Sequence, residues 1–153
     1  MISIEPGSWL SEWAERHAEG FVYLDFLTAV DRVDRIEIVA HVLNPDSRER
    51  VLASTAVPNE DPRLDSLSTL YIGASWHERE TAEMFGVLFV GLDDSRQLLL
   101  RTGLGGPPMR RSAVLAARVA LDWPGTAEPG GSPSRRRQRP PGVPDEWLEP
   151  RHD

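Results

Sequence analysis

The stretch ASWHERETAEMFGVLF, residues 74–89, decides the fold, because it combines a charged helical pattern with a sharp stop before an apolar run. Ser75 is placed as an N-cap, and Glu78 follows three residues later, as in a capping box. Gly86 is the residue type that most often ends a helix. We therefore predict a helix over residues 75–85.

The chain before this helix has the alternating pattern of a half-buried sheet. Residues 35–43, RIEIVAHVL, place an apolar side chain at every second position. Residues 21–31 and 51–57 are rich in β-branched and aromatic residues, and turns separate the three runs. We predict an antiparallel meander with one packed face, preceded by a helix over residues 8–17 that Ser8 caps.

The remaining segments complete the prediction of an α+β fold. Residues 87–91 predict a short strand, residues 64–70 fit a short helix or a turn, and residues 112–121 fit a helix or an extended apolar strip. We predict one domain over residues 1–123, in which a small, mostly antiparallel sheet packs against helices. Residues 124–153 hold seven of the 13 prolines and cannot bury enough apolar surface to fold alone. We predict that they form an extended Pro/Gly-rich arm that wraps partner subunits.

Composition narrows the possible functions. A chain of 153 residues is long enough for one domain with a hydrophobic core. It contains no cysteine, which excludes disulfides, zinc–thiolate sites and thiolate-bound iron–sulfur clusters. The net charge of −7 argues against nucleic acid as the main partner. No secretory signal or apolar run of membrane-spanning length is visible, so we expect a cytoplasmic protein that reaches a membrane only through a partner.

The charged block of the helix allows several kinds of site. His77-Glu78 begins like the His-Glu-x-x-His motif of zinc proteases, but Thr81 stands where the second histidine belongs. Glu80 and Glu83 are neighbours on a helix, and such a carboxyl pair can raise one pKa for acid/base catalysis. The sequence therefore favours neither metal binding nor catalysis strongly.

An ion-pair network explains the same block better. Arg79 can reach Glu83 one helical turn away, and Glu80 can meet an arginine from another segment. Our hypothesis is that Glu78, Arg79 and Glu80 form a network, in which some members face the sheet of this domain and others face a larger partner subunit.

Two further motifs are weak. TGLGGPP, residues 102–108, is glycine-rich but lacks the Gly-Lys-Ser/Thr ending of a phosphate-binding loop. RRRQRPP, residues 135–141, could neutralise phosphates or dock on an acidic protein surface. From the residues alone we infer a scaffold without its own cofactor. A soluble enzyme using Glu80 and Glu83, and a nucleic-acid-binding module using the arginine cluster, stay open as alternatives.

The stretch over residues 74–89 also resembles the signature of the C subunit, the 30 kDa-type subunit, of respiratory complex I, the proton-pumping NADH:quinone oxidoreductase. The same domain occurs in membrane-bound [NiFe] hydrogenases related to complex I. The residues that fall on the pattern are Trp76, Glu78, Arg79, Glu80, Phe85, Gly86 and Phe89. The resemblance continues over GLDDSRQLLL (91–100, with Arg96), GGPPMRR (105–111, with Arg110 and Arg111) and the tail, where Trp123 and Trp147 stand. Leu92 and Pro107 occupy positions where the family usually has histidine, which indicates a divergent member.

The resemblance implies a non-catalytic structural subunit of the peripheral arm, on the cytoplasmic face of the plasma membrane. Its implied partners are complex I subunits D and B, of which the first is hydrogenase-like, with subunit I as a further candidate. It implies that NADH, FMN, iron–sulfur clusters and quinone are bound by those partners, with no cofactor, metal or nucleic acid on this chain. The interface or structural residues are then the seven residues on the pattern together with Glu83, Arg96, Arg110, Arg111, Trp123 and Trp147. An equivalent subunit of a related membrane-bound hydrogenase is the alternative.

Overall fold

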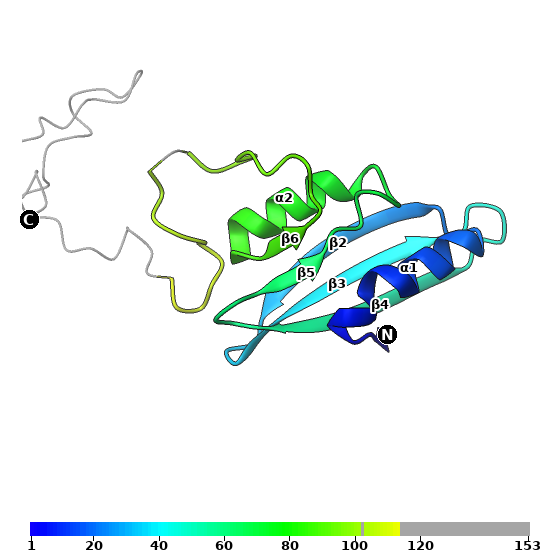
Figure 1. The fold of residues 1–153 in the computed structure, drawn as a ribbon, viewed down its shortest axis with the longest axis horizontal. Coiled ribbons are helices and arrows are strands. Elements are labelled where there is room, and N and C mark those ends of the chain that lie inside the picture. Colours follow the sequence, from blue (N-terminus) through cyan, green and yellow to red (C-terminus); the bar gives the residue numbers. More distant parts are fainter. Residues whose placement is uncertain (102, 114–153) are drawn as a thin grey trace, which may run out of the picture. The chain divides into compact units, whose positions relative to one another are not determined.

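The computed structural model describes residues 1–101 and 103–113, which fold around one central sheet (Figure 1). The sheet has the strand order β1-β4-β3-β2. Its strands are β1 (Ile2–Ser3), β2 (Tyr23–Asp31), β3 (Arg35–Leu43) and β4 (Arg50–Pro58). The predicted antiparallel meander is confirmed for β2, β3 and β4. The short strand β1, which pairs with β4 in parallel, was not predicted.

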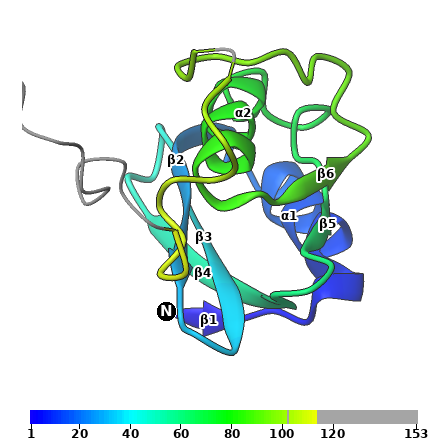
Figure 2. The same cartoon turned by 90° about the vertical axis from the view of Figure 1, so that its left-hand side faces the viewer.

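The alternation of β3 defines the buried face of this sheet. Ile36, Ile38, Ala40 and Val42 are all fully buried, whereas the residues between them are partly exposed. Successive side chains of a strand point to opposite faces, so these four residues form one apolar row. Figure 2 shows the helices and the remaining strands on one side of the sheet, where this row meets them. The α+β architecture is therefore as predicted.

The helix α1 (Trp9–Ala18) follows a single 3-10 turn, η1 (Pro6–Ser8), and matches the predicted helix closely. Ser8 is the N-cap residue, although its side chain makes no capping hydrogen bond. Trp9 and Trp13 are one turn apart and fully buried, with their rings edge-to-face at 5.5 Å between centroids. The helix thus contributes its largest side chains to the core.

A second sheet corrects the prediction for residues 64 and 65, whereas the turn predicted within residues 64–70 is present at residues 68–70. Strand β5 (Arg63–Asp65) pairs in parallel with β6 (Leu88–Val90), the strand expected after the charged helix. A turn follows β5 and leads into helix α2 (Ala74–Phe85). A three-residue strand is too short for periodicity to distinguish it from a turn, which explains the error.

Some predictions lie outside the described residues. They concern the segment 114–121, the arm over residues 124–153, and the tryptophans Trp123 and Trp147. Within residues 1–101 and 103–113, no helix has the length and apolar character that crossing a membrane requires.

Candidate functional site

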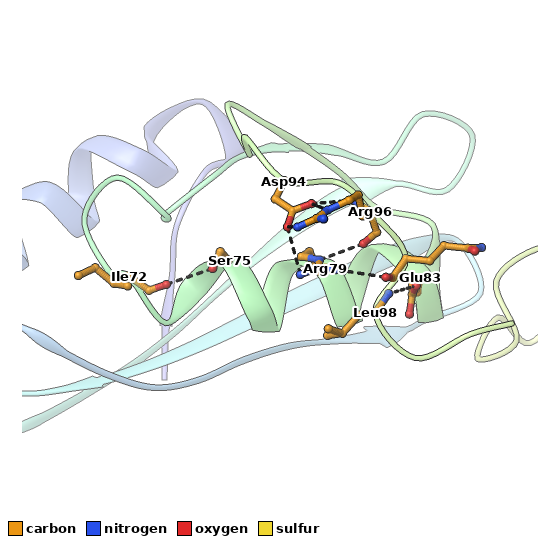
Figure 3. Close-up of polar contacts among 8 residues, drawn as sticks. Ile72, Ser75, Arg79, Glu83, Asp94, Arg96 and Leu98 are labelled. Atoms are coloured by element: carbon orange, nitrogen blue, oxygen red, sulfur yellow. Dashed lines mark hydrogen bonds and ion pairs between the residues drawn. The ribbon is translucent and has the colours of Figure 1, made fainter. Parts of the chain in front are cut away.

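Helix α2 begins differently from the prediction. Its N-cap is Gly73, and no side chain caps it, so the capping box proposed from Ser75 and Glu78 is wrong. The Ser75 hydroxyl donates instead to the carbonyl of Ile72 at 3.1 Å (Figure 3). The predicted C-terminal stop is confirmed, since Gly86 adopts a left-handed conformation (φ 74°) and its N–H donates to the Ala82 carbonyl.

Glu78 belongs to the buried stripe of α2. It lies between Ala74 and Thr81 at spacings of four and three residues, and all three are buried. Such spacings place side chains on one face of a helix. The capping-box spacing and the buried-stripe spacing coincide in this sequence, which is why the sequence did not separate them.

The carboxylate of Glu78 holds the turn that follows β5. It accepts the hydroxyl of Ser66 and the backbone N–H of Leu67, both at 2.6 Å. Glu78 is 0% exposed, and this burial raises its pKa to about 7, although the two hydrogen bonds act in the opposite direction. The side chain therefore fixes a turn 11 to 12 residues earlier in the sequence.

Arg79 holds a different segment, the loop after β6. Its Nε donates to the carbonyl of Arg96 at 2.9 Å and its Nη2 to the carbonyl of Gln97 at 3.1 Å (Figure 3). Its Nη1 lies 3.3 Å from a carboxylate oxygen of Asp94. Only 12% of the Arg79 side chain is exposed, so the guanidinium is largely enclosed by the backbone it binds.

Glu83, one turn further along α2, binds the same loop at its next residues. Its carboxylate accepts the backbone N–H of Leu98 (Figure 3). It also accepts the backbone N–H groups of Leu99 at 2.8 Å and of Leu100 at 3.3 Å. Partial burial favours the neutral acid, but these three donors and the charge of Arg79 outweigh it and hold the pKa of Glu83 below its usual value. Glu83 is therefore a carboxylate committed to backbone groups.

An ion pair within the loop supports this arrangement. Arg96 donates through Nε and Nη2 to the two carboxylate oxygens of Asp94, each at 2.8 Å. The hydrogen bonds from Arg96 are the main reason that the pKa of Asp94 lies well below its usual value. Asp94 therefore forms ion pairs with Arg96 in the loop and with Arg79 on α2.

The predicted network of Glu78, Arg79 and Glu80 is wrong for the described part of the chain. Glu78 pairs with a hydroxyl and an amide, and Glu80 is exposed, with no ion pair or hydrogen bond to any residue that the structure describes. Trp76 is 62% exposed, and its ring centroid lies 5.6 Å from the Arg79 guanidinium carbon. Long-range backbone partners, which sequence spacing does not reveal, replace the expected ion pairs.

The C-terminal end of α2 is tied to the segment around Arg110. The Arg110 guanidinium donates to the carbonyl of Phe85 at 2.6 Å and to the side-chain oxygen of Asn59 at 2.6 Å. The next residue, Arg111, donates its backbone N–H to the buried Asp31 carboxylate at 2.9 Å. Of the two phenylalanines of the signature, Phe85 is partly buried against the core and Phe89 is 5% exposed.

The described residues offer no obvious chemical centre. Within residues 1–101 and 103–113, no three His, Asp or Glu side chains are grouped so that they could hold a metal ion. Of the two carboxylates considered for catalysis, Glu83 is bound by backbone amides and Glu80 is exposed. The arrangement is one helix whose polar side chains Glu78, Arg79 and Glu83 hold two loops in place.

A comparison with known families covers the helix and both loops. The sequence profile of the family described as "Respiratory-chain NADH dehydrogenase, 30 Kd subunit" matches residues 4–119, which include the whole of α2 and both loops. The chain belongs to this family. The resemblance given by the signature over residues 74–89 is therefore confirmed.

Individual relatives show the same membership. The chain is 34% identical over 112 residues to the C subunit of the NADH-quinone oxidoreductase of Sinorhizobium medicae (strain WSM419), covering 71% of this chain and 55% of that protein. It is 41% identical over 112 residues to the C 1 subunit of the NADH-quinone oxidoreductase of Rhizobium etli (strain CIAT 652), covering 71% and 56%. The chain thus spans about half the length of the curated relatives that it matches.

Two solved structures resemble the fold. A trypsin-resistant fragment of Nqo5 has a TM-score of 0.56 and 28% identity, covering 60% of this chain and 79% of that fragment. A chain of the membrane-bound sulfane sulfur reductase, an archaeal respiratory membrane complex, has a TM-score of 0.67 and 22% identity, covering 75% and 71%. The second likeness concerns the fold alone.

Proposed function

We propose that this chain is a non-catalytic structural subunit of the peripheral arm of a proton-pumping NADH:quinone oxidoreductase. One observation carries the proposal: the signature side chains of α2 bind the backbone of this chain's own loops. Glu78 holds one turn, while Arg79 and Glu83 hold the loop after β6. Side chains that bind their own backbone in this way shape a surface, and none of the three is placed to act on a substrate.

The surface that they shape has the character of an interface. The loop fixed by Glu83 presents Leu99, which is 60% exposed. The turn before α2 presents Ile72 and the first turn of the helix presents Trp76, at 92% and 62%. Exposed large apolar side chains on a rigid support are typical of protein interfaces, in which tryptophan is enriched. Holding the loop in advance also lowers the ordering cost of association.

The partners in this proposal are complex I subunits D and B, of which the first is hydrogenase-like, with subunit I as a further candidate. NADH, FMN, iron–sulfur clusters and quinone are bound by partner subunits, and this chain supports electron transfer to quinone by positioning them. The complex holds the chain peripherally on the cytoplasmic face of the plasma membrane. The family membership and the relatives named as C subunits of NADH-quinone oxidoreductases support this assignment.

Purification from native membranes tests the proposal. The full chain, carrying an affinity tag, is expected to bring down subunits D and B, identified by mass spectrometry, with NADH:quinone activity in the purified material. Purified alone, the chain is expected to have no turnover. Recovery of the chain without cluster-bearing partners, or activity of the isolated chain, would show that it is not a scaffold subunit.

A matched pair of variants tests the surface itself. Leu99→Asp adds a charge to the exposed side chain of the held loop and leaves its backbone N–H in place, so we expect loss of co-purifying subunits. Val33→Asp, at a similarly exposed residue (66%) with a positive φ in the β2–β3 turn, is the control and is expected to assemble normally. Equal assembly of both variants would show that Leu99 is not part of the interface.

A further inference from the structure

Glu78 is a buried carboxyl group with no cationic partner within residues 1–101 and 103–113. Among these residues its pKa responds to burial, to the Ser66 hydroxyl and to the Leu67 N–H, and to no charged side chain. A buried carboxylate is ordinarily paired with a cation or surrounded by donors, because an isolated charge is costly in an apolar interior. Glu78 has two hydrogen-bond donors but no nearby positive charge that would hold it in the ionised form. It can therefore change its charge.

A chain of oxygen atoms leads outward from this carboxyl group. Glu78 Oε2 lies 2.6 Å from Ser66 Oγ, and Ser66 Oγ lies 2.7 Å from Ser68 Oγ. Ser66 is 3% exposed, whereas Ser68 is only partly buried. The three side chains therefore connect a fully enclosed acid to the protein surface through two hydroxyl groups, each of which can both donate and accept.

The hydrogen bonds of this chain of oxygens can be satisfied in both charge states of Glu78. When Glu78 is ionised, the Ser66 hydroxyl donates to Glu78, and the Ser68 hydroxyl donates to Ser66. When Glu78 is neutral, its O–H donates to Ser66, and the Ser66 hydroxyl turns to donate to Ser68. In both states the Ser68 N–H donates to Ser66 Oγ and the Leu67 N–H donates to Glu78 Oε1.

The surrounding elements place few charges near this site, and those present are engaged elsewhere. On β2, Asp31 accepts two backbone N–H groups and Asp25 pairs with His41. On the turn, the Tyr71 hydroxyl donates to the Phe21 carbonyl, and the His17 ring of α1 lies edge-on to the Tyr71 ring. The remaining titratable groups on these elements are Tyr23 on β2, Arg63 and Asp65 on β5, Glu12, Glu15 and Arg16 on α1, and His77, Arg79, Glu80 and Glu83 on α2 itself. None of them contributes to the pKa of Glu78.

We propose that Glu78 is a proton-binding site inside the domain, and that Ser66 and Ser68 carry the proton between this carboxyl group and water. In the loading step, Ser68 takes a proton from a hydronium ion, which becomes water; Ser68 passes its own proton to Ser66, and Ser66 passes its own to Glu78. Each hydroxyl gains one proton and loses one, so within the protein only Glu78 changes charge. The turn after β5 stays attached to α2 throughout.

The site belongs to this chain's own core, so it does not depend on which partners the chain has. A carboxyl group that takes up a proton near neutral pH without releasing its loop can buffer or sense local proton concentration at fixed shape. An ordinary exposed glutamate cannot do this, because its pKa lies far below neutral pH.

Carbon-13 NMR of the full chain, labelled at the glutamate carboxyl carbons, tests the proposal. Titration from about pH 5 to about pH 9 should show one carboxyl carbon with a midpoint near 7, separate from the others. Glu78→Gln should remove that signal, and Glu80→Gln, at an exposed position of the same helix, should leave it unchanged. A wild-type protein in which every glutamate titrates below about pH 5 would overturn the site.

Serine variants test the route independently of whether Glu78→Gln folds. Ser66→Ala removes a donor to the ionised form, so the midpoint should rise. Ser68→Ala should slow exchange between the two forms, measured by relaxation dispersion at the midpoint, and Ser68→Thr should restore it by returning a hydroxyl. Unchanged exchange in Ser68→Ala would overturn the serine route, and a midpoint that does not rise in Ser66→Ala would overturn the arrangement of donors.

Discussion

Glu83 and Leu99 are 16 residues apart in the sequence, yet the backbone N–H of Leu99 donates to the Glu83 carboxylate at 2.8 Å. The same carboxylate accepts the N–H groups of Leu98 and Leu100, so one side chain of α2 satisfies three consecutive amides. Consecutive amides that converge on one oxygen pair leave the loop little freedom. Leu99 is therefore exposed in a defined position and does not depend on a partner to order it.

Glu83→Ala should release this loop. One hydrogen bond to a charged acceptor contributes about 1.5–3 kcal/mol. Because this site is partly exposed and water can replace the carboxylate, we expect the three bonds together to contribute about 2 kcal/mol. Urea unfolding of the full chain measures this loss, and hydrogen exchange should show faster exchange at residues 98–100. Glu80→Ala is the control and should change stability by less than about 0.5 kcal/mol. Equal protection of the three amides in both variants would contradict the role of Glu83.

Arg79→Lys separates the shape of the guanidinium from its charge. Lysine keeps the positive charge near Asp94 but cannot bind the carbonyls of Arg96 and Gln97 with a planar fork. We expect a loss of about 1 kcal/mol for Arg79→Lys and about 2 kcal/mol for Arg79→Ala. Denaturant unfolding gives the stabilities, and native gels of assembled membranes show whether assembly falls in the same order. A lysine variant as stable as wild type would show that charge alone suffices.

The sequence predicted correctly those features that depend on neighbouring residues, and it missed contacts between distant segments. The alternation of Ile36, Ile38 and Ala40 is a pattern of neighbouring residues, and it located β3 and its buried face correctly. The stop at Gly86 is local as well. The partners of Arg79 and Glu83 lie 15 to 18 residues away, on a loop with no periodic pattern, and spacing along the helix pointed instead to ion pairs between the two.

Glu78 shows a second limit of prediction from sequence, because its spacing fits two structural roles. Its distance from Ser75 fits a capping box, and its distances from Ala74 and Thr81 fit a buried stripe. The charge of Glu78 favours the capping box, because an unpaired acidic side chain is rarely fully buried. The structure resolves the ambiguity through Ser66 and Leu67, which belong to a turn that the sequence did not define.

Gly86→Ala should destabilise the end of α2. Gly86 has φ 74°, a conformation that costs an L residue about 1–2 kcal/mol, and an added Cβ would lie 3.2 Å from the Pro107 side chain. We expect a loss of about 2 kcal/mol, measured by thermal or denaturant unfolding. Gly73→Ala, at the other end of the same helix, is the control, since nothing lies within 4 Å of its added Cβ and its φ is −67°. A loss as large at Gly73 as at Gly86 would contradict this explanation.

The buried acid predicts how stability depends on pH. The pKa of Glu78 is about 7 in the folded chain against an ordinary value of 4.5 in the unfolded chain, so the folded state binds the extra proton between these values. Its contribution to stability is therefore complete below about pH 4.5 and is lost as pH rises to about 7, by about 3 kcal/mol in all. Glu83 and Asp31, whose pKa values are lowered, lose their contributions only on acidification below 4.5 and 3.8, outside this window.

Glu78→Gln should abolish this slope, because glutamine has the hydrogen-bonding pattern of the neutral acid. Its carbonyl can accept the Leu67 N–H and its amide can donate to Ser66, so the variant should retain the turn. Urea unfolding at about pH 5 and about pH 8 should give similar stabilities for the variant and a lower stability at the higher pH for wild type. At about pH 8 the variant should therefore be the more stable protein, while Glu80→Gln should follow wild type. A wild-type chain equally stable at both values would mean that Glu78 holds its usual charge in the folded state.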